Sequence, residues 1–306
     1  MASRASFAEP LDGLLRSFAL TLRTEGKSER TVTIYRLGVE HFSGWLASHG
    51  QPADLSGLTR DNVRGWLDSL RARGLSDGSV LTHWRGVRRF TGWALSEKII
   101  RKDPLAGITM DRPEAPAVAV FPDEELAALI GACKGSAFTD RRDEAIIRLL
   151  MDCGLRVGEL VGIDCKDLDL DTQQVPITGK GDRARMAYFG SKTALAIDRY
   201  LRARRGHRHA GDPALLLGER GRLSPDGVRE RLKIRADRAG LDPKLVHPHR
   251  FRHTAAHDWL MAGGQERDLM RLLGWRSEAM LSRYGASAAD VRARQAARRL
   301  SRGDRV

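Results

Sequence analysis

The chain has 306 residues, which is long enough for two domains that each bury a core of their own. Its 52 Lys and Arg residues against 39 Asp and Glu residues give a net charge of +13, which favours a polyanionic partner such as nucleic acid, although a basic surface without such a partner has the same composition. No run of about 20 apolar residues predicts a membrane helix, no N-terminal apolar core predicts a signal peptide, and three scattered cysteines exclude a disulfide framework, so we expect a cytoplasmic protein with buried, reduced thiols.

The first hundred residues predict a compact domain of four helices. Apolar side chains recur at spacings of three and four, and glycines at positions 26, 50 and 74 end the first three stretches. The second helix is expected to begin at Ser28, and Thr59 is expected to cap the third. The predicted helices span residues 7–22, 28–46, 59–70 and 77–94.

The fourth predicted helix has a basic face opposite its apolar one, formed by His83, Arg85, Arg88 and Arg89. Two interpretations of this face remain open. It is either a solvated surface, as most runs of charge are, or a DNA-binding surface that contacts phosphates along a groove.

A linker of residues 106–120 follows, in which prolines and glycines interrupt any helical pattern. It separates a first domain, residues 1–105, from a second domain, residues 121–306. The change in pattern at the linker therefore predicts a two-domain chain.

The second domain is predicted as mainly helical with one small antiparallel sheet. Short alternating runs within residues 166–189 flank a glycine turn that carries Lys180 at its tip. Arg156 lies in a tight turn between two further helices, and pairing with Glu159 would be its ordinary structural role.

Residues 247–284 are the stretch around which the rest of the chain is organised. His249 and Arg252 are three residues apart, so they share one face of a helix. The pattern resumes after a glycine pair, reaches Trp275, and ends in a last short helix that carries Tyr284. An imidazole, a guanidinium and a separate phenol form a set that can attack a phosphodiester.

The C-terminal residues predict an oligomerisation tail. Ser277 can cap the short helix, and Ser287 with Asp290 has the pattern of a capping box that starts another. A thin apolar strip from Val291 to Leu300 lies among arginines. Such a strip is too weak to fold alone but suits a groove on a neighbouring protomer.

Five motifs in order carry a family resemblance: GLRVGEL around Arg156, GKGDRAR around Lys180, HPHRFRHTAA around His249 and Arg252, LLGWRS around Trp275, and Tyr284 nine residues beyond that tryptophan. No single motif is decisive, but together they resemble the tyrosine recombinase (phage integrase) family over about residues 10 to 300. The resemblance implies a mainly α fold with a small antiparallel β-sheet, in which a helical N-terminal core-DNA-binding domain precedes the tyrosine recombinase catalytic domain.

The resemblance also implies a role for each motif residue. Tyr284 would be the nucleophile that forms a 3′-phosphotyrosyl bond, and His249 would assist its deprotonation. Arg156 and Arg252 would clamp the non-bridging oxygens of the phosphate. Lys180 would protonate the leaving 5′-oxygen.

Trp275 stands where most members of that family have histidine. Its indole N–H can donate a hydrogen bond to a phosphate oxygen but cannot shuttle a proton. His253 and His257 have the spacing of zinc ligands, but no carboxylate or cysteine pair completes such a site. We therefore expect no metal and no cofactor, because a covalent phosphotyrosine conserves the bond energy needed for resealing.

The implied function is site-specific recombination of the integrase or resolvase type, by an enzyme that a phage or other mobile element encodes. Four protomers would close around two double-stranded DNA sites and exchange strands through a Holliday junction. Two alternatives remain. A type IB topoisomerase uses a similar residue set but relaxes supercoils as a monomer, and a non-catalytic DNA-binding protein would keep the fold without cleavage.

Overall fold

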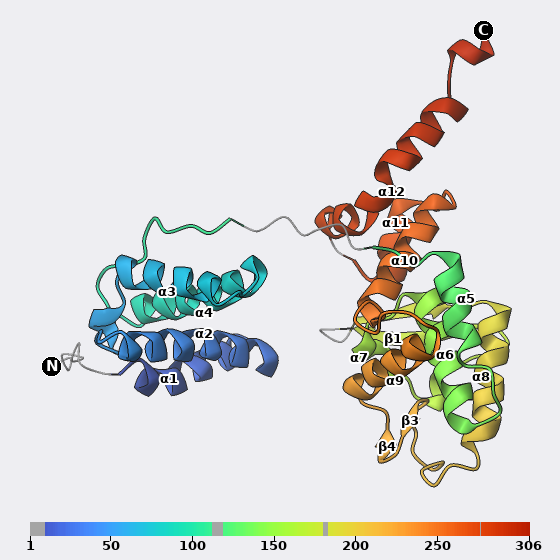
Figure 1. Cartoon of the computed structure of the whole chain (residues 1–306), viewed down its shortest axis with the longest axis horizontal. Coiled ribbons are helices and arrows are strands. Elements are labelled where there is room, and N and C mark those ends of the chain that lie inside the picture. The colour runs from blue at the N-terminus through green and yellow to red at the C-terminus, as the bar shows by residue number, and fades with distance from the viewer. Residues whose placement is uncertain (1–9, 112–118, 180–182, 276) are drawn as a thin grey trace. The chain divides into compact units, whose positions relative to one another are not determined.

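The computed structural model describes residues 10–111, 119–179, 183–275 and 277–306 (Figure 1). The chain divides into two compact units, Met1–Ala115 and Pro116–Val306. Each unit buries a large apolar core, and these two cores share no residue. Within the described ranges no helix has the length and apolar character needed to cross a bilayer.

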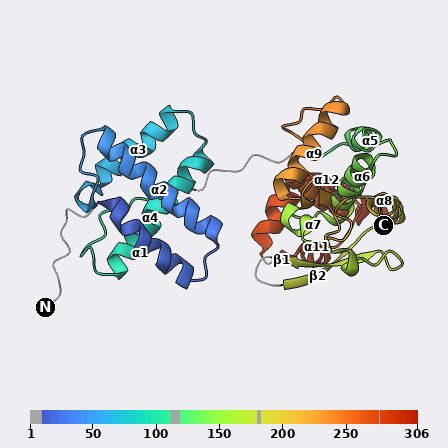
Figure 2. The same cartoon turned by 90° about the horizontal axis from the view of Figure 1, so that it is seen from below.

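The N-terminal unit is built from helices, as the apolar spacing predicts. They are α1 (Leu11–Thr24), α2 (Glu29–Ser48), α3 (Arg60–Ala72) and α4 (Asp77–Ser96), with a 3-10 turn at Leu55–Gly57. α2 packs against both α1 and α4 (Figure 2). The predicted cap is confirmed, because Thr59 Oγ1 accepts from the N–H of Asn62 at 3.2 Å. Ser28, where the second helix was expected to begin, is also an N-cap, and its Oγ accepts from the N–H of Thr31 at 3.3 Å.

The C-terminal unit is also mainly helical. Its described helices are α5 (Asp123–Gly131), α6 (Phe138–Cys153), α7 (Val157–Val161), α8 (Ser191–Arg204), α9 (Pro225–Arg238), α10 (Pro248–Met261), α11 (Glu266–Leu273) and α12 (Glu278–Arg299). The central helix α6 is buried along most of its length and packs against α8, α9 and α10. Asp143 of α6, itself 1% exposed, accepts hydrogen bonds from Arg231 and Arg235 of α9, so a buried ion cluster fixes these two helices together.

The predicted antiparallel sheet is present. The strands are β1 (Gln174–Gly179), β2 (Arg183–Tyr188), β3 (Leu217–Gly218) and β4 (Gly221–Arg222), paired as β1 with β2 and β3 with β4. Val175 and Ile177 bury against the core, and Arg185 lies opposite Ile177 across the pair. The turn that carries Lys180 lies outside the described residues. The two-residue strands β3 and β4 were not predicted.

The last helix is longer than predicted. Ser277 holds the expected N-cap position, but α12 then continues without a break to Arg299. The predictions of a short helix and of a new one capped by Ser287 and Asp290 are therefore wrong. Alanine and arginine, both strong helix formers, dominate residues 286–299 and carry the helix through the expected stop.

Candidate active site

The sharp turn between α6 and α7 presents Arg156. Gly154 ends α6 in the left-handed conformation (φ 53°), and a Cβ there would lie 2.9 Å from Cδ2 of Leu273, so glycine is required. At the N-cap of α7, the backbone N–H of Arg156 donates to Oε2 of Glu159 at 2.9 Å, and its Nη1 donates to Oε1 at 2.8 Å. The Arg156 side chain is 47% exposed. Its guanidinium therefore reaches solvent while one edge rests on a buried carboxylate.

Arg252 lies on α10 and is only 2% exposed. Its Nη1 donates to the carbonyl of Gly154 at 2.7 Å, and its Nη2 donates to the carbonyl of Leu273. Its guanidinium carbon lies 5.6 Å from the ring centroid of Trp275. One buried arginine thus fastens the turn that carries Arg156 to the turn that carries Trp275, and it brings motifs together that are far apart in the sequence.

The first turn of α10 presents His249 to solvent. His247 caps this helix, because its Nδ1 accepts from the backbone N–H of Arg250 at 3.2 Å, and Pro248 follows at the first helical position. Burial, together with the charge of Arg250, lowers the pKa of His247 below its ordinary value, which favours the neutral ring that can accept this bond. The Nε2 atoms of His249 and the buried His253 are 3.2 Å apart.

A hollow of about 370 Å³ joins these residues. Its charged or titratable lining residues come from the α6–α7 turn, α9 and the start of α10, and they are Arg156, Arg229, His247, His249 and Arg252. Among the described residues, no carboxylate lines this hollow. Guanidinium forks match phosphate oxygens in bidentate geometry, so the hollow suits a phosphodiester.

Two arginines at or near the hollow were not among the site residues predicted from the sequence. Arg229 lies on the lining and pairs with Asp226 of the same helix at 2.5 Å. Arg185 of β2 donates through Nη2 to Oε2 of Glu159 at 2.9 Å. The GKGDRAR motif contains Arg185, but only tertiary contact places it beside α7. Arg229 has no motif around it, so no sequence signal would have found it.

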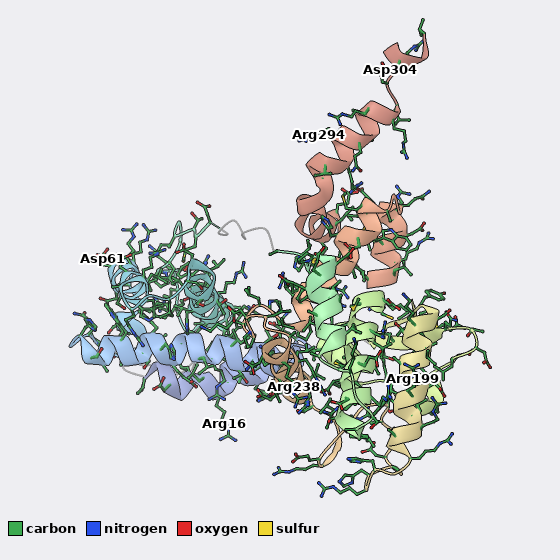
Figure 3. All side chains as sticks on the ribbon, turned by 45° about the vertical axis from the view of Figure 1, so that its right-hand side comes forward. Arg16, Asp61, Arg199, Arg238, Arg294 and Asp304 are labelled. Carbon is green, nitrogen blue, oxygen red and sulfur yellow. The ribbon has the colours of Figure 1, made fainter. Side chains whose placement is uncertain are left out.

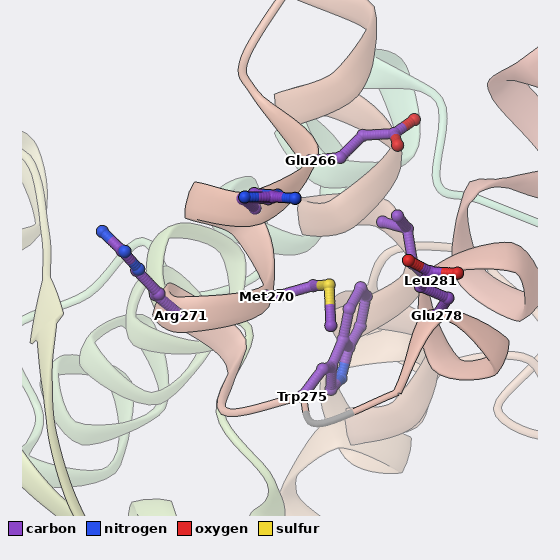
Figure 4. A pocket seen from close by; sticks show the side chains of 7 residues that line it. Glu266, Met270, Arg271, Trp275, Glu278 and Leu281 are labelled. Atoms are coloured by element: carbon purple, nitrogen blue, oxygen red, sulfur yellow. The ribbon is translucent and has the colours of Figure 1, made fainter.

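Trp275 is 6% exposed and lies in the turn between α11 and α12. Its backbone N–H donates to the carbonyl of Met270 at 2.8 Å. In Figure 4 its ring lies between Met270 of α11 and the α12 residues Glu278 and Leu281, at a second hollow of about 600 Å³. Packing from both helices therefore fixes the indole.

Two of the predicted catalytic side chains lie outside the described residues, those of Lys180 and Tyr284. The backbone of Tyr284 belongs to α12, which packs against α10, the helix of His249 and Arg252. The helix that contains Tyr284 thus packs directly on the helix that contains His249 and Arg252. Among the residues that the structure describes, no three His, Cys, Asp or Glu side chains gather closely enough to share a metal ion.

The predicted basic face of α4 is partly occupied by contacts within its own unit. Arg88 pairs with Asp103 at 2.6 Å, Arg89 pairs with Glu25, and the ring of His83 stacks on that of His41 at 4.6 Å. Arg85 is exposed and has no ion-pair partner in the described part of the chain. Its guanidinium is therefore open to solvent.

Both units match known proteins. A family model described as the phage integrase family matches residues 119–290, and one described as the phage integrase N-terminal SAM-like domain matches residues 15–98. The tyrosine recombinase XerC of Chromobacterium violaceum is 31% identical over 267 residues, 86% of each chain. The tyrosine recombinase XerD of Corynebacterium glutamicum is 32% identical over 275 residues, which cover 87% of this chain and 90% of the relative.

Solved structures share the fold. One is the XerH site-specific recombinase bound to its palindromic difH substrate, with 17% identity, a TM-score of 0.75 and coverage of 94% of this chain and 84% of that one. Another is the Tn1549 transposon integrase in complex with a circular intermediate DNA, with 18% identity, a TM-score of 0.74 and coverage of 94% and 99%. At these identities the likeness concerns the fold alone.

Proposed function

The chain belongs to the phage integrase family of tyrosine recombinases, enzymes that break and rejoin DNA strands, and we propose that it forms a covalent 3′-phosphotyrosyl bond through Tyr284 at specific DNA sites. The observation that carries the proposal is the convergence of Arg156, His249 and Arg252 on one hollow free of carboxylates among the described residues. A hollow with this charge stabilises the negative charge that grows on a phosphodiester under attack.

The proposed first step exchanges one phosphorus–oxygen bond for another and transfers two protons. The Tyr284 oxygen attacks the phosphorus while His249 assists the loss of its proton, and the bond from phosphorus to the 5′-oxygen breaks. Lys180 donates a proton to the leaving 5′-oxygen. General acid catalysis of this kind typically raises a reaction rate by about 10² to 10⁴. Attack by the 5′-hydroxyl of another strand reverses the step and releases the tyrosine.

The arginines and the indole support this step without moving protons. Arg156 and Arg252 bind the non-bridging oxygens, and loss of one such preorganised donor costs about 10² to 10³ in rate. Trp275 supplies a hydrogen bond at most, because its N–H is not a titrating group. The acid and base work therefore rests on Lys180 and His249.

We extend the proposal to the assembly. Four protomers bind two double-stranded sites and exchange strands through a Holliday junction, and the end of α12 serves as the oligomerisation tail. Arg85 and its neighbours on α4 contribute phosphate contacts. We infer recombination of the kind carried out by the relatives named tyrosine recombinase XerC and XerD. The expected source of the gene is a phage or another mobile element.

Capture of the covalent adduct tests the proposal. Wild-type protein is incubated in EDTA with a library of nicked duplexes, and the trapped sites are sequenced. We expect an adduct with wild type and none with Tyr284→Phe, which removes one oxygen atom. Tyr188→Phe is the matched control, because Tyr188 is an exposed tyrosine on β2 and should be dispensable.

An adduct that persists in the Tyr284→Phe variant would place the nucleophile elsewhere. Pairs of the captured sites then separate recombination from relaxation. Recombinant product from two sites supports the proposal, whereas supercoil relaxation without any exchange would establish the topoisomerase reaction in its place.

A further inference from the structure

Arg185 is a largely buried arginine beside the candidate active site that has no assigned role. It lies on β2, and its side chain is 12% exposed. Nη2 donates to Glu159, while Nη1 is buried and has no hydrogen-bond partner in the described part of the chain. A Cβ on Gly274, which takes a positive φ of 64°, would lie 3.2 Å from Cδ and Nε of Arg185, so the stem packs against the α11–α12 turn.

Glu159 joins two arginines of different exposure. Its Oε1 accepts from Nη1 of Arg156 at 2.8 Å, and its Oε2 accepts from Nη2 of Arg185 at 2.9 Å. The carboxylate is 5% exposed, so water screens its charge poorly. A buried carboxylate with a single cation would hold that cation firmly and offset its charge. With two cations it leaves a net positive charge at the pair.

Arg185 does not line the hollow that suits the phosphate. Its influence on a phosphate therefore passes through Glu159 and Arg156. Burial is the main cause that lowers the pKa of Arg185, because it removes water from the charged guanidinium. The nearby carboxylate of Glu159 offsets this desolvation cost and so helps Arg185 to stay charged.

We propose that Arg185 is a positioning residue, which neutralises Glu159 through Oε2, the oxygen that the Arg156 guanidinium does not use, so that Arg156 keeps its exposed edge and its charge for the scissile phosphate. This inference rests on the proposed function. It predicts that Arg185 affects the rate of cleavage, that it does so only while Glu159 is charged, and that it leaves DNA affinity unchanged.

A double-mutant cycle tests the inference. The single-turnover rate of adduct formation on a captured nicked duplex is measured for wild type, Arg185→Gln, Glu159→Gln and the double variant. We expect Arg185→Gln to slow the reaction about tenfold or more, with the Kd for DNA within about twofold of wild type. In the Glu159→Gln background the same change should have an effect of about twofold or less, because residues that act through one another are not additive.

Arg222→Gln is the matched control. Arg222 also pairs with a carboxylate, Asp164 at 2.5 Å, and with a backbone carbonyl, that of Val161 at 2.8 Å, but it does not touch Glu159. Its rate should equal that of wild type. Should Arg185→Gln unfold, Arg185→Lys carries the test, since it keeps the charge and should recover most of the rate.

Three outcomes would overturn the inference: a wild-type rate in Arg185→Gln, an equal slowing with and without the Glu159 charge, or Arg185→Lys as slow as Arg185→Gln in folded protein. The failure of the proposed function is distinguishable from these. In that case wild-type protein forms no Tyr284-dependent adduct at all, and no rate exists to compare.

Discussion

Arg156 and Arg252 have the same proposed role but differ in their surroundings. Arg156 is nearly half exposed and rests on one carboxylate, whereas Arg252 is 2% exposed and binds the carbonyls of Gly154 and Leu273. The first can turn toward a phosphate without disturbing the backbone. The second holds two turns of the fold in place. A substitution of Arg156 is therefore expected to affect catalysis alone, whereas a substitution of Arg252 is expected to affect both catalysis and stability.

This difference gives a prediction for the two alanine variants. Arg156→Ala and Arg252→Ala should each slow adduct formation by about 10² or more, while DNA affinity is largely kept by contacts elsewhere. Only Arg252→Ala should also lower the free energy of unfolding, by about 1 to 3 kcal/mol, because two buried carbonyls lose their donor. Single-turnover cleavage and urea unfolding measure the two effects. Near-normal cleavage by either variant would remove that arginine from the active site.

At the scale of an element, α10 depends on an imidazole for its cap. Ser, Thr, Asp and Asn are the usual N-cap residues, and at their ordinary pKa values none of them changes charge near neutral pH. The Nδ1 of His247 accepts the N–H of Arg250 only while it is unprotonated. The helix that carries His249 and Arg252 therefore has a pH-dependent start.

The sign of the pH dependence follows from the lowered pKa of His247. The folded protein binds a proton at this residue less readily than the unfolded chain does. The stability that the neutral cap contributes is thus fully present above the ordinary histidine pKa of about 6.5, and it is lost as the pH falls below that value and through the lowered pKa of the folded state. His247→Asn keeps an acceptor that does not titrate, so its Tm should fall less than that of wild type between pH 7.5 and pH 5.5. Parallel Tm curves for the two proteins would contradict this account.

Most helices of the fold could be predicted from the sequence, because the features that indicate a helix are local. Apolar spacing and caps such as Ser28 and Thr59 act within a few residues. The hydrogen bond from Arg185 to Glu159 joins β2 to α7, so the spacing of residues along the sequence does not predict it. The length of α12 was missed for another reason: Gly285 and Ser287 resemble a stop, but the alanines and arginines after them favour the helix more strongly. The motif residues were found by family resemblance, and spacing alone did not assign their roles.

At the scale of the whole molecule, the chain carries two separate cores. The N-terminal core contains buried aromatic rings such as Trp66 and Phe90, and the C-terminal core is built around α6. Charged side chains cover both units, with Arg16 on α1 and Arg238 on α9 as examples (Figure 3). A unit with its own core and a polar surface meets the conditions for folding alone.

We therefore expect residues 1–115 to fold as an isolated fragment. The fragment should show helical circular dichroism and a cooperative thermal transition, because its core uses no residue of the other unit. The control is the same fragment with Trp66→Ala, which removes a side chain that is 1% exposed and should lower stability by about 3 to 5 kcal/mol. A fragment without a cooperative transition would mean that the core needs the rest of the chain.

The unbroken course of α12 has a mechanical consequence. With 22 residues at about 1.5 Å each, the helix has an axial rise of about 33 Å, and the backbone of Tyr284 belongs to its first half. Arg294 lies toward its other end (Figure 3). A salt bridge of 2.8 Å from Arg292 to Glu266 braces it against α11. We therefore expect that a molecule bound to the arginine-rich end of α12 shifts the backbone position of Tyr284 through the same helix.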